Sequence, residues 1–426
     1  MFFSKMIRIA ISTLGCKVNQ AESASIISQF DLNSYTIVEW GDEADIYIIN
    51  SCTVTNRTDY KSRYLIRQAL SKKAINPLVK VIVTGCFAQR SEKEIYALGE
   101  VDYVVDNQQK LNIASILKGL EFQFADIMEA KTFSFAPVSK MQQHTRAFQK
   151  IQDGCDFYCS YCAVPYARGH SRSATLQQVI QQARLFADCG YKEIVLGGVN
   201  LGLYLDGSYK LADVVESIAN IQGIEIIRLS SIEPQLFSNE LIIRLKAISK
   251  VCPHFHIPLQ SGSNAILNSM KRHYNTDLVR ELVNKIEDAF PNSAIGFDVI
   301  TGYPGESELH HKETVDFLAT LPLAYLHVFS YSMRKDTPAA LMPNQIMKAE
   351  KINRSRQLQK LSDTFKKKYQ ERCSQGNVTL RGVVEKQYDG RSEFLSDHFL
   401  RVQIPRTVPI GDFVTTSFND VLVIND

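Results

Sequence analysis

Apolar and polar residues alternate in short runs over the first part of the chain. Runs rich in β-branched residues are followed by stretches with a helical period, a pattern typical of a parallel sheet covered by helices on both faces. We therefore expect an N-terminal α/β domain over residues 1–125. Its expected strands are Ile7–Thr13, Ile46–Asn50, Val79–Thr84 and Tyr103–Val105, and its expected helices are Ala21–Phe30 and Asp59–Leu70.

The same alternation resumes, with longer units, after a weakly patterned linker at residues 122–146. Six apolar runs are separated by helical stretches such as Leu176–Cys189 and Asp277–Phe290, which predicts a partial (β/α)6 barrel. This central α/β domain is expected over residues 141–372. Its expected strands are Phe148–Gln152, Glu193–Val199, Ile226–Ser231, His254–Leu259, Ala294–Thr301 and Tyr325–Tyr331.

The pattern changes again toward the end of the sequence. Pro343–Arg372 is one long helical stretch rich in Lys and Arg, and the helical period disappears after Gly376. Short apolar runs split by Gly and Pro then predict a small β-barrel over residues 373–426. The expected strands are Val378–Lys386, Glu393–Leu395, His398–Gln403, Phe413–Phe418 and Val421–Ile424.

Composition narrows the class of protein. At 426 residues the chain is too long for one core, and 45% hydrophobic with 22% charged residues is typical of globular proteins. No run of about 18 apolar residues and no secretory leader is present, so we expect a cytoplasmic protein with no membrane segment. Nine cysteines in such a chain favour metal binding or catalysis over disulfides. A net charge of +3 does not by itself indicate nucleic-acid binding.

The most specific local motif contains three cysteines within eight residues, which we call the central triad: Cys155, Cys159 and Cys162. A [4Fe–4S] cluster takes one cysteine per iron, so three thiolates leave one iron open. An open iron can bind S-adenosylmethionine (SAM) and pass one electron to its sulfonium, which releases a 5′-deoxyadenosyl radical. The alternative is a structural zinc loop, but zinc takes four ligands, usually in CxxC pairs.

A second set of cysteines, the N-terminal triad, is dispersed in sequence but shares one structural position: Cys16, Cys52 and Cys86. Each follows an expected strand by two or three residues. Because the carboxyl ends of parallel strands lie on one edge of a sheet, we expect the three thiols to converge and hold a second [4Fe–4S] cluster. Three separate buried cysteines are the alternative. The remaining thiols belong to no spaced set and are expected to be packed or incidental: Cys189, Cys252 and Cys373.

Around these cysteines the sequence resembles the radical-SAM methylthiotransferases. The similarity covers nearly the whole chain and keeps the order of the domains, with the C-terminal barrel resembling the family's TRAM domain. The segments similar to the family's N-terminal domain are Thr13–Gln20, Asn50–Thr55 and Thr84–Cys86. The segments similar to its radical-SAM domain are Gly154–Gly169, Arg172–Ser173, His256–Ser263 and Gly302–Glu306.

The resemblance implies a division of labour between the triads. The cluster of the central triad would cleave SAM, and the cluster of the N-terminal triad would hold the sulfur. A second SAM would supply the methyl group, and the methylthio group would be transferred to a carbon from which the radical had removed hydrogen. The implied partners are an electron donor protein of the flavodoxin or ferredoxin type and a sulfur donor.

Within the family, Gly15–Gln20 is similar to the branch that modifies C2 of N6-threonylcarbamoyladenosine at position 37 in the tRNA anticodon loop. The isopentenyladenosine branch typically has Gln and Met in place of Lys17 and Val18, and the branch that modifies a ribosomal protein aspartate has a different pattern. These two substrates remain alternatives. A third alternative is a non-catalytic Fe–S RNA-binding protein, which would have no use for two open irons. One departure from the family is Asp336, where glycine is usual.

Candidate SAM contacts lie at the carboxyl edge of the barrel. Barrel ligands bind at this edge, and glycine lets the backbone approach a ligand closely. Helix capping is the alternative role for the Asn and Ser residues. The candidates are Gly197, Gly198, Asn200, Ser231, Glu233, Gln260 and Ser261.

Candidate RNA contacts lie near the end of the sequence. The basic stretch Lys348–Arg372 and the cations of the small barrel suit phosphates, and aromatic residues of the barrel suit stacking on unpaired bases. A solvated charged face is the alternative for the helix. The barrel cations are Arg381, Lys386, Arg391, Arg401 and Arg406, and the aromatic residues are Tyr388, Phe394 and Phe399.

Overall fold

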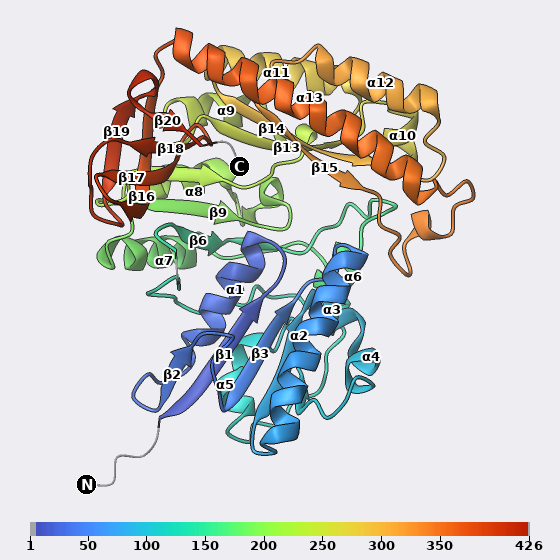
Figure 1. Cartoon of the computed structure of the whole chain (residues 1–426), viewed down its shortest axis with the longest axis vertical. Coiled ribbons are helices and arrows are strands. Elements are labelled where there is room, and N and C mark those ends of the chain that lie inside the picture. Colours follow the sequence, from blue (N-terminus) through green and yellow to red (C-terminus); the bar gives the residue numbers. More distant parts are fainter. Residues whose placement is uncertain (1–5, 143, 425–426) are drawn as a thin grey trace.

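The computed structural model describes residues 6–142 and 144–424 and has three parts that follow one another along the chain (Figure 1). An N-terminal α/β unit lies against one side of a curved α/β barrel, and a small antiparallel sheet lies at one end of that barrel. The expected α/β fold class is confirmed. The residue boundaries of the three domains stay predictions. No helix in the described ranges is long and apolar enough to cross a membrane.

The N-terminal sheet is wholly parallel, with the strand order β2-β1-β3-β4-β5. Successive residues of its strands face opposite sides. Ile9 and Ile48 pack on one side against the first helix, and Ala10 and Ile49 pack on the other side against the second. The bounds are β1 Ile7–Thr13, α1 Lys17–Ile27, β2 Tyr35–Val38, β3 Ile46–Ser51, α2 Asn56–Ile75, β4 Lys80–Gly85, α3 Cys86–Arg90, α4 Glu92–Tyr96, β5 Tyr103–Val104 and α5 Ile113–Ile116.

The barrel is built from six parallel strands in two groups of three, β12-β9-β6 and β13-β14-β15. The groups meet where the Ile227 amide donates to the Lys250 carbonyl at 2.8 Å and the Cys252 amide donates to the Ile227 carbonyl at 2.9 Å. The bounds are β6 Ala147–Lys150, α7 Leu176–Asp188, β9 Glu193–Gly197, α8 Leu211–Ala219, β12 Ile226–Leu229, α9 Asn239–Lys246, β13 His254–Gln260, α10 Asn264–Ser269, α11 Thr276–Ala289, β14 Ala294–Thr301, α12 Glu308–Ala319 and β15 Tyr325–Ser330.

The alternation of side chains along the barrel strands separates an apolar outside from a polar inside. Ile194, Phe255 and Phe297 belong to the large core that the surrounding helices cover. Several positions of the opposite parity are polar and contact one another. Arg228 donates to Glu193 at 2.8 Å, and His254 shares a hydrogen bond of 2.8 Å with the Tyr325 hydroxyl. The barrel interior is therefore lined with charged and hydrogen-bonding groups.

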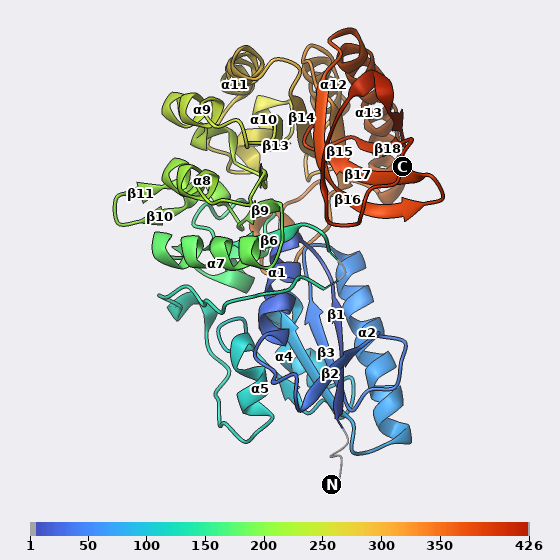
Figure 2. The same cartoon turned by 90° about the vertical axis from the view of Figure 1, so that its left-hand side faces the viewer.

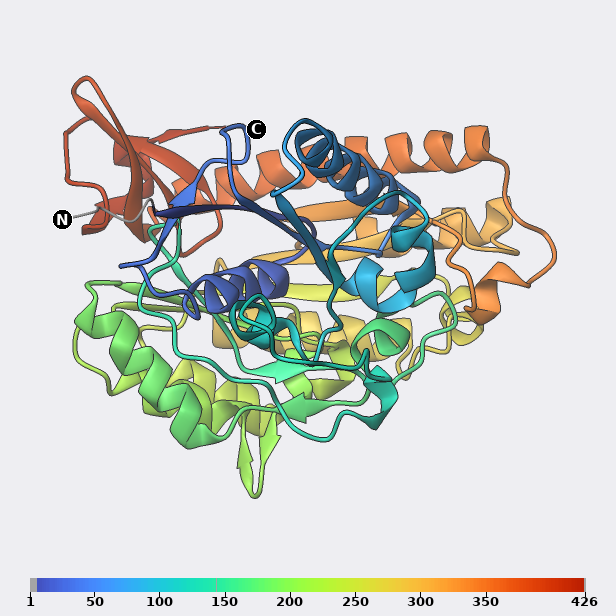
Figure 3. The same ribbon diagram turned by 90° about the horizontal axis from the view of Figure 1, so that it is seen from below.

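A long helix, α13 (Lys348–Gln375), runs beside β15 to the C-terminal sheet, as Figure 3 shows. The sheet is antiparallel, with the order β19-β16-β17-β18-β20. Among the described residues β19 and β20 lie at its two edges, so closure into a TRAM barrel stays a prediction. The bounds are β16 Thr379–Tyr388, β17 Arg391–Ser396, β18 Arg401–Ile404, β19 Phe413–Ser417 and β20 Leu422–Val423.

The C-terminal sheet sits directly on the end of the barrel. The buried Arg228 donates to the Ser396 carbonyl at 3.0 Å. The ring of Phe399 stacks on His254 with their centroids 4.2 Å apart. This sheet therefore covers the end of the barrel at which β13 begins with His254 and β15 begins with Tyr325, whose ring also stacks on Phe399.

The end of β4 has no room for a side chain. Gly85 has a φ of 93°, and a Cβ built there would lie 2.4 Å from the Ser51 carbonyl oxygen and 2.6 Å from Asn50 Oδ1. Both neighbours belong to the adjacent strand β3, so the contact cannot be relieved by a flexible side chain alone. The glycine lets β3 and β4 end side by side immediately before Cys52 and Cys86.

We expect Gly85→Ala to lower the free energy of unfolding by about 3 kcal/mol or more, because it adds backbone strain to a steric overlap. Gly119→Ala is the matched control, since Gly119 has a φ of 100° and a Cβ added there would have nothing within 4 Å. It should cost only about 1 kcal/mol of strain. Urea unfolding of the two variants followed by circular dichroism makes the comparison. Equal losses of unfolding free energy in both variants would show that the tight packing at Gly85 does not contribute to stability.

Candidate active site

The structure brings the N-terminal triad together at one edge of the N-terminal sheet. Cys16 precedes α1, Cys52 follows β3 and Cys86 begins α3, so the three residues lie at the carboxyl ends of three neighbouring strands, β1, β3 and β4. A Cβ at Gly15 would lie 2.8 Å from Cys52 Sγ. Burial and the nearby Cys86 and Cys16 sulfurs raise the pKa of Cys52 to about 12. Ionised thiols at these positions would repel one another, so a cation or a metal is needed to compensate their charge.

The central triad lies on the loop between β7 (Gln152–Asp153) and α6 (Val164–Arg168). The two ends of this loop are held together, because β7 pairs with β8 (Arg172–Ser173) and the Cys155 amide donates to the Gly169 carbonyl at 3.1 Å. Burial, followed by the neighbouring Cys159 and Cys155, raises the pKa of Cys162 to about 12. The three cysteines thus share one loop whose two ends are fixed.

A buried arginine contacts the central triad. Arg272 Nη1 donates to Cys159 Sγ at 3.0 Å, and its Nη2 forms an ion pair with Glu233. Arg272 Nε donates to the Tyr274 hydroxyl at 2.9 Å, which in turn donates to the Leu259 carbonyl at 2.7 Å. Burial raises the pKa of the Cys159 thiol, and the Arg272 charge opposes that rise. Arg272 therefore favours the thiolate that a metal cluster requires.

Asn200 and the two candidate glycines follow one another at the end of β9, but they have different environments. Asn200 Nδ2 lies 3.8 Å from Cys155 Sγ, and Asn200 Oδ1 is buried without a hydrogen-bond partner in the described part of the chain. Gly197 ends β9. A Cβ at Gly198 would lie 2.9 Å from Gln152 Oε1, so packing against Gln152 explains the absence of a side chain there.

The other candidate SAM contacts also have different environments. Ser231 Oγ lies 2.8 Å from His256 Nδ1, and Glu233 is paired with Arg272 beside the central triad. Gln260, with a φ of 69°, ends β13 at the carboxyl edge. Ser261 instead shares a hydrogen bond of 3.2 Å with Thr314 of α12. The SAM-contact role of all seven residues stays a prediction.

Sequence reasoning missed the two arginines whose side chains contact cysteine sulfurs, Arg168 and Arg272. Arg168 lies within a segment similar to the family motif, but nothing in the sequence distinguishes a buried arginine from one that faces solvent. Inside the barrel, sequence reasoning also missed that Asp298 accepts from two imidazoles, His256 at 2.9 Å and His327 at 3.3 Å. These pairings depend on neighbouring strands and so have no local signal.

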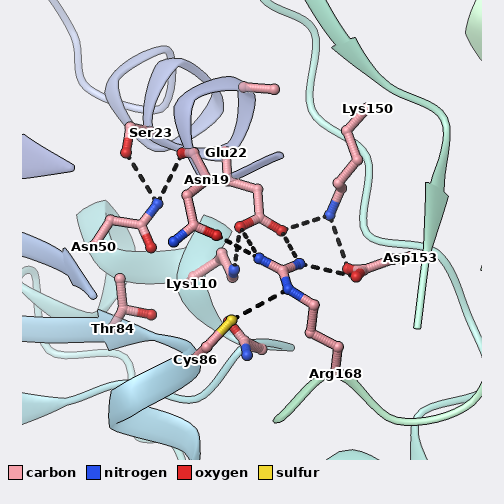
Figure 4. A network of polar contacts seen from close by, with 12 residues as sticks. Asn19, Glu22, Ser23, Asn50, Thr84, Cys86, Lys110, Lys150, Asp153 and Arg168 are labelled. Atoms are coloured by element: carbon pink, nitrogen blue, oxygen red, sulfur yellow. Dashed lines mark hydrogen bonds and ion pairs between the residues drawn. The ribbon is translucent and has the colours of Figure 1, made fainter. Parts of the chain in front are cut away.

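A buried ionic network joins the N-terminal unit to the barrel, with Arg168 at its centre (Figure 4). Arg168 Nη1 donates to Glu22 of α1 at 2.9 Å and to Asp153 of β7 at 2.8 Å. Lys110 and Lys150 donate to the two oxygens of Glu22 at 2.6 and 2.8 Å. Although burial alone raises the pKa of the Glu22 carboxyl, the three cations hold it well below its usual range. Figure 2 shows α1, which carries Glu22, between the N-terminal sheet and β6.

A second set of contacts between the two units includes the residue that departs from the family pattern. Arg334 pairs with Asp59 of α2 at 2.5 Å, and Arg90 of α3 pairs with Asp336 at 3.3 Å. Asp336 has a φ of 67°, in the left-handed region where glycine is favoured and Asp is tolerated. The turn expected from the family glycine is therefore kept, and the carboxylate adds an ion pair to Arg90.

The chemistry of these donor sets fits [4Fe–4S] clusters and a polar ligand. Three thiols converge in each triad, which suits a cluster with one open iron. Asn200 Oδ1 and Ser230 Oγ are buried and have no hydrogen-bond partner among the described residues. Both residues follow barrel strands at the carboxyl edge, and Asn200 lies beside Cys155, so a polar ligand such as SAM would satisfy these atoms.

Both units match known protein families. Residues 8–106 match the family described as "Uncharacterized protein family UPF0004", and residues 150–318 match the "Radical SAM superfamily". The chain is 38% identical over 414 residues to "Threonylcarbamoyladenosine tRNA methylthiotransferase MtaB" of Aquifex aeolicus (strain VF5), covering 96% of this chain and 99% of that protein. The chain belongs to the radical-SAM methylthiotransferase family. It is an enzyme of that family, which implies SAM and a [4Fe–4S] cluster.

Further relatives support the same family. The protein of the same name from Bacillus subtilis (strain 168) is 39% identical, covering 85% of this chain and 82% of that protein. "Ribosomal protein uS12 methylthiotransferase RimO" of Desulfitobacterium hafniense (strain Y51) is 32% identical, covering 96% and 95%. The solved radical S-adenosylmethionine methyltransferase TsrM from Kitasatospora setae has a TM-score of 0.60 at 12% identity, covering 79% and 77%, and shares the fold.

We expect Arg272→Gln to lower the free energy of unfolding of the metal-free enzyme by about 3 kcal/mol, because it leaves the mostly buried Glu233 carboxylate without its cation. Adding Glu233→Gln should recover part of this loss. Arg244→Gln is the control, since Arg244 pairs with Asp213 and Glu216 near the surface and should lose about 1 kcal/mol or less. Urea unfolding measures all three variants. An Arg272→Gln loss no larger than that of Arg244→Gln would contradict the role of the pair.

Proposed function

We propose that this enzyme is a tRNA methylthiotransferase that modifies C2 of N6-threonylcarbamoyladenosine at position 37, using two [4Fe–4S] clusters and two molecules of SAM. The observation that carries the proposal is the presence of two complete cysteine triads, one in each of two units that a buried ionic network joins. The names of the Aquifex aeolicus and Bacillus subtilis relatives support this nucleoside as the substrate.

The reaction needs a radical because the C2–H of adenine is too strong and too weakly acidic for a side-chain base to remove. When bound, the two clusters supply the electron that cleaves SAM and the sulfur that the product receives. Arg272 compensates the charge of Cys159, and Asn200 lies beside Cys155 with its carbonyl oxygen available to a ligand. The buried Tyr274 and Arg272 and the partly buried Tyr161 exclude water around the central triad, which limits quenching of a reactive radical.

The nucleic acid would lie on the exposed cations of α13 and of the C-terminal sheet. The structure narrows the set predicted from the sequence, because some of those cations are used internally. Arg354 is buried and pairs with Glu306 at 2.7 Å, and Arg372 pairs with Glu287 at 3.3 Å. The α13 cations that stay exposed are Lys348, Arg356, Lys360, Lys366, Lys367 and Lys368.

The exposure of the aromatic residues of the C-terminal sheet also differs from that expected for an RNA-stacking surface. Phe394 is fully buried in the core of the sheet, so it cannot stack on a base. Phe399 is stacked on His254 at the end of the barrel. Tyr388, which is 47% exposed, is the one of the three that is available to an unpaired base.

We expect the purified, reconstituted enzyme to convert threonylcarbamoyladenosine to its 2-methylthio derivative in tRNA, because position 37 is unpaired and can be presented to a pocket at low cost. Nucleoside digestion and mass spectrometry measure the product. Cys16→Ala is the control: it should still form 5′-deoxyadenosine but no methylthio product, since it alters only the N-terminal triad. Product on isopentenyladenosine alone, or on ribosomal protein uS12 with tRNA untouched, would refute the substrate.

We expect about eight irons per chain after anaerobic reconstitution, because each triad holds one four-iron cluster. Replacing Cys155, Cys159 and Cys162 together with Ala should halve this number, and replacing the three cysteines of the N-terminal triad should do the same. Iron analysis together with electron paramagnetic resonance measures the loss. Full iron retention in either triple variant would contradict the cluster assignment for that triad.

A further inference from the structure

Arg168 lies between the two triads. It is the last residue of α6, six residues after Cys162, and it is only 2% exposed. Its Nε donates to Cys86 Sγ of the N-terminal triad at 3.3 Å. Its Nη1 donates to Asp153, two residues before Cys155, at 2.8 Å. One guanidinium thus contacts a sulfur of one triad and the strand that leads into the other (Figure 4).

The orientation of Arg168 is fixed from several directions. Nη2 donates to Asn19 Oδ1 at 2.6 Å and to Glu22 Oε2 at 3.0 Å, and both partners lie on α1 directly after Cys16. Asn19 is itself fixed, because its Nδ2 donates to the Leu14 carbonyl at 2.7 Å and to the Ser51 carbonyl at 3.1 Å. These carbonyls lie beside Cys16 and Cys52. In the N-terminal unit the guanidinium therefore donates to Cys86 itself and to two residues that follow Cys16 within six positions, Asn19 and Glu22.

The charges around Arg168 do not balance within the network itself. Three cations, Lys110, Lys150 and Arg168, surround two carboxylates, Glu22 and Asp153. Arg172, whose Nη2 lies 3.6 Å from Asp153, adds a further positive charge at the edge. An uncompensated charge is costly in a buried site. The group that faces the surplus charge is the sulfur of Cys86, so an anionic ligand there completes the network.

We propose that Arg168 is the positioning residue that couples the two cluster sites: it holds the sulfur of Cys86, raises the reduction potential of the N-terminal cluster, and ties that cluster to the loop of the central triad. The inference rests on the proposed function in one respect, since it requires a cluster at the N-terminal triad. It goes beyond that function by assigning the control of this cluster to a residue from the other domain.

The physical reason for the effect on potential is electrostatic. A reduced cluster carries one more negative charge than an oxidised one, so an N–H donor and a fixed positive charge beside a ligating sulfur stabilise the reduced form. Loss of such an outer contact also typically costs about 10- to 100-fold in metal affinity or activity. Lys150 provides a comparison, because it contacts the same two carboxylates but no cysteine.

Three variants separate contact with the sulfur from the charge of the network. Arg168→Gln removes the contact with the sulfur, while Lys110 and Lys150 still provide Glu22 and Asp153 with cationic partners. Lys150→Gln is the matched control, since it removes one charge from the same network and keeps the contact with Cys86. Arg168→Lys keeps the charge, but its donors sit on a single nitrogen and cannot reproduce the guanidinium fork that contacts Cys86, Asn19 and the two carboxylates from three nitrogens. It replaces Arg168→Gln in the comparison if that variant does not accumulate.

The test is made on the full chain with Cys155, Cys159 and Cys162 replaced by Ala, so that only the N-terminal cluster is present. Redox titration followed by electron paramagnetic resonance measures its midpoint potential. We expect Arg168→Gln to shift the potential to a more negative value, Arg168→Lys to shift it less, and Lys150→Gln to shift it least. In the chain with both triads intact, Arg168→Gln should lower methylthio product per 5′-deoxyadenosine by about 10- to 100-fold.

An unchanged potential in Arg168→Gln, or an equal shift in Arg168→Gln and Lys150→Gln, overturns the inference, because the contact with the sulfur would then have no specific effect. Absence of iron in the parent protein of this series has a different meaning. It would show that the N-terminal triad holds no cluster, and so would refute the proposed function rather than the assignment of Arg168.

Discussion

The buried contact between Arg168 and its anionic partners holds the N-terminal unit against the barrel. Glu22 lies on the first helix and Asp153 on the strand before the central triad, so one guanidinium connects elements that are far apart in sequence. A buried ion pair of this kind adds little to stability when it is complete, but losing one partner is costly. Together with the Arg334–Asp59 and Arg90–Asp336 pairs, the network therefore joins the N-terminal unit to the rest of the chain.

The two triads reach their positions by different routes. The central triad needs only one loop, whose ends β7 and β8 hold together. The N-terminal triad needs three separate strands to end at one edge, and it depends on the order β1-β3-β4 in the sheet. A change that alters the approach of β3 and β4 would move Cys52 and Cys86 together. The central triad is thus a local structure, whereas the N-terminal triad is a property of the whole sheet.

Each triad also has one buried arginine on one of its sulfurs, Arg272 on Cys159 and Arg168 on Cys86. Both arginines are held by carboxylates as well, Glu233 in one case and Glu22 with Asp153 in the other. Thiols in buried sites resist ionisation, and a fixed cation offsets that resistance. The C-terminal sheet covers the opposite end of the barrel, where Phe399 stacks on His254 and the Ser396 carbonyl accepts a hydrogen bond from Arg228.

The sequence by itself determined the α/β class, the strands that carry the cysteines and the six expected barrel strands, because periodicity and strand-end positions are local signals. It did not predict β2 (Tyr35–Val38), a four-residue strand whose pairing with β1 decides its existence. It placed Phe394 on an RNA surface, although cross-strand packing buries it in the core of the C-terminal sheet. It gave no sign of the partners of Arg168 either. Burial and charge pairing depend on which residues of distant segments meet, and only the tertiary structure decides that.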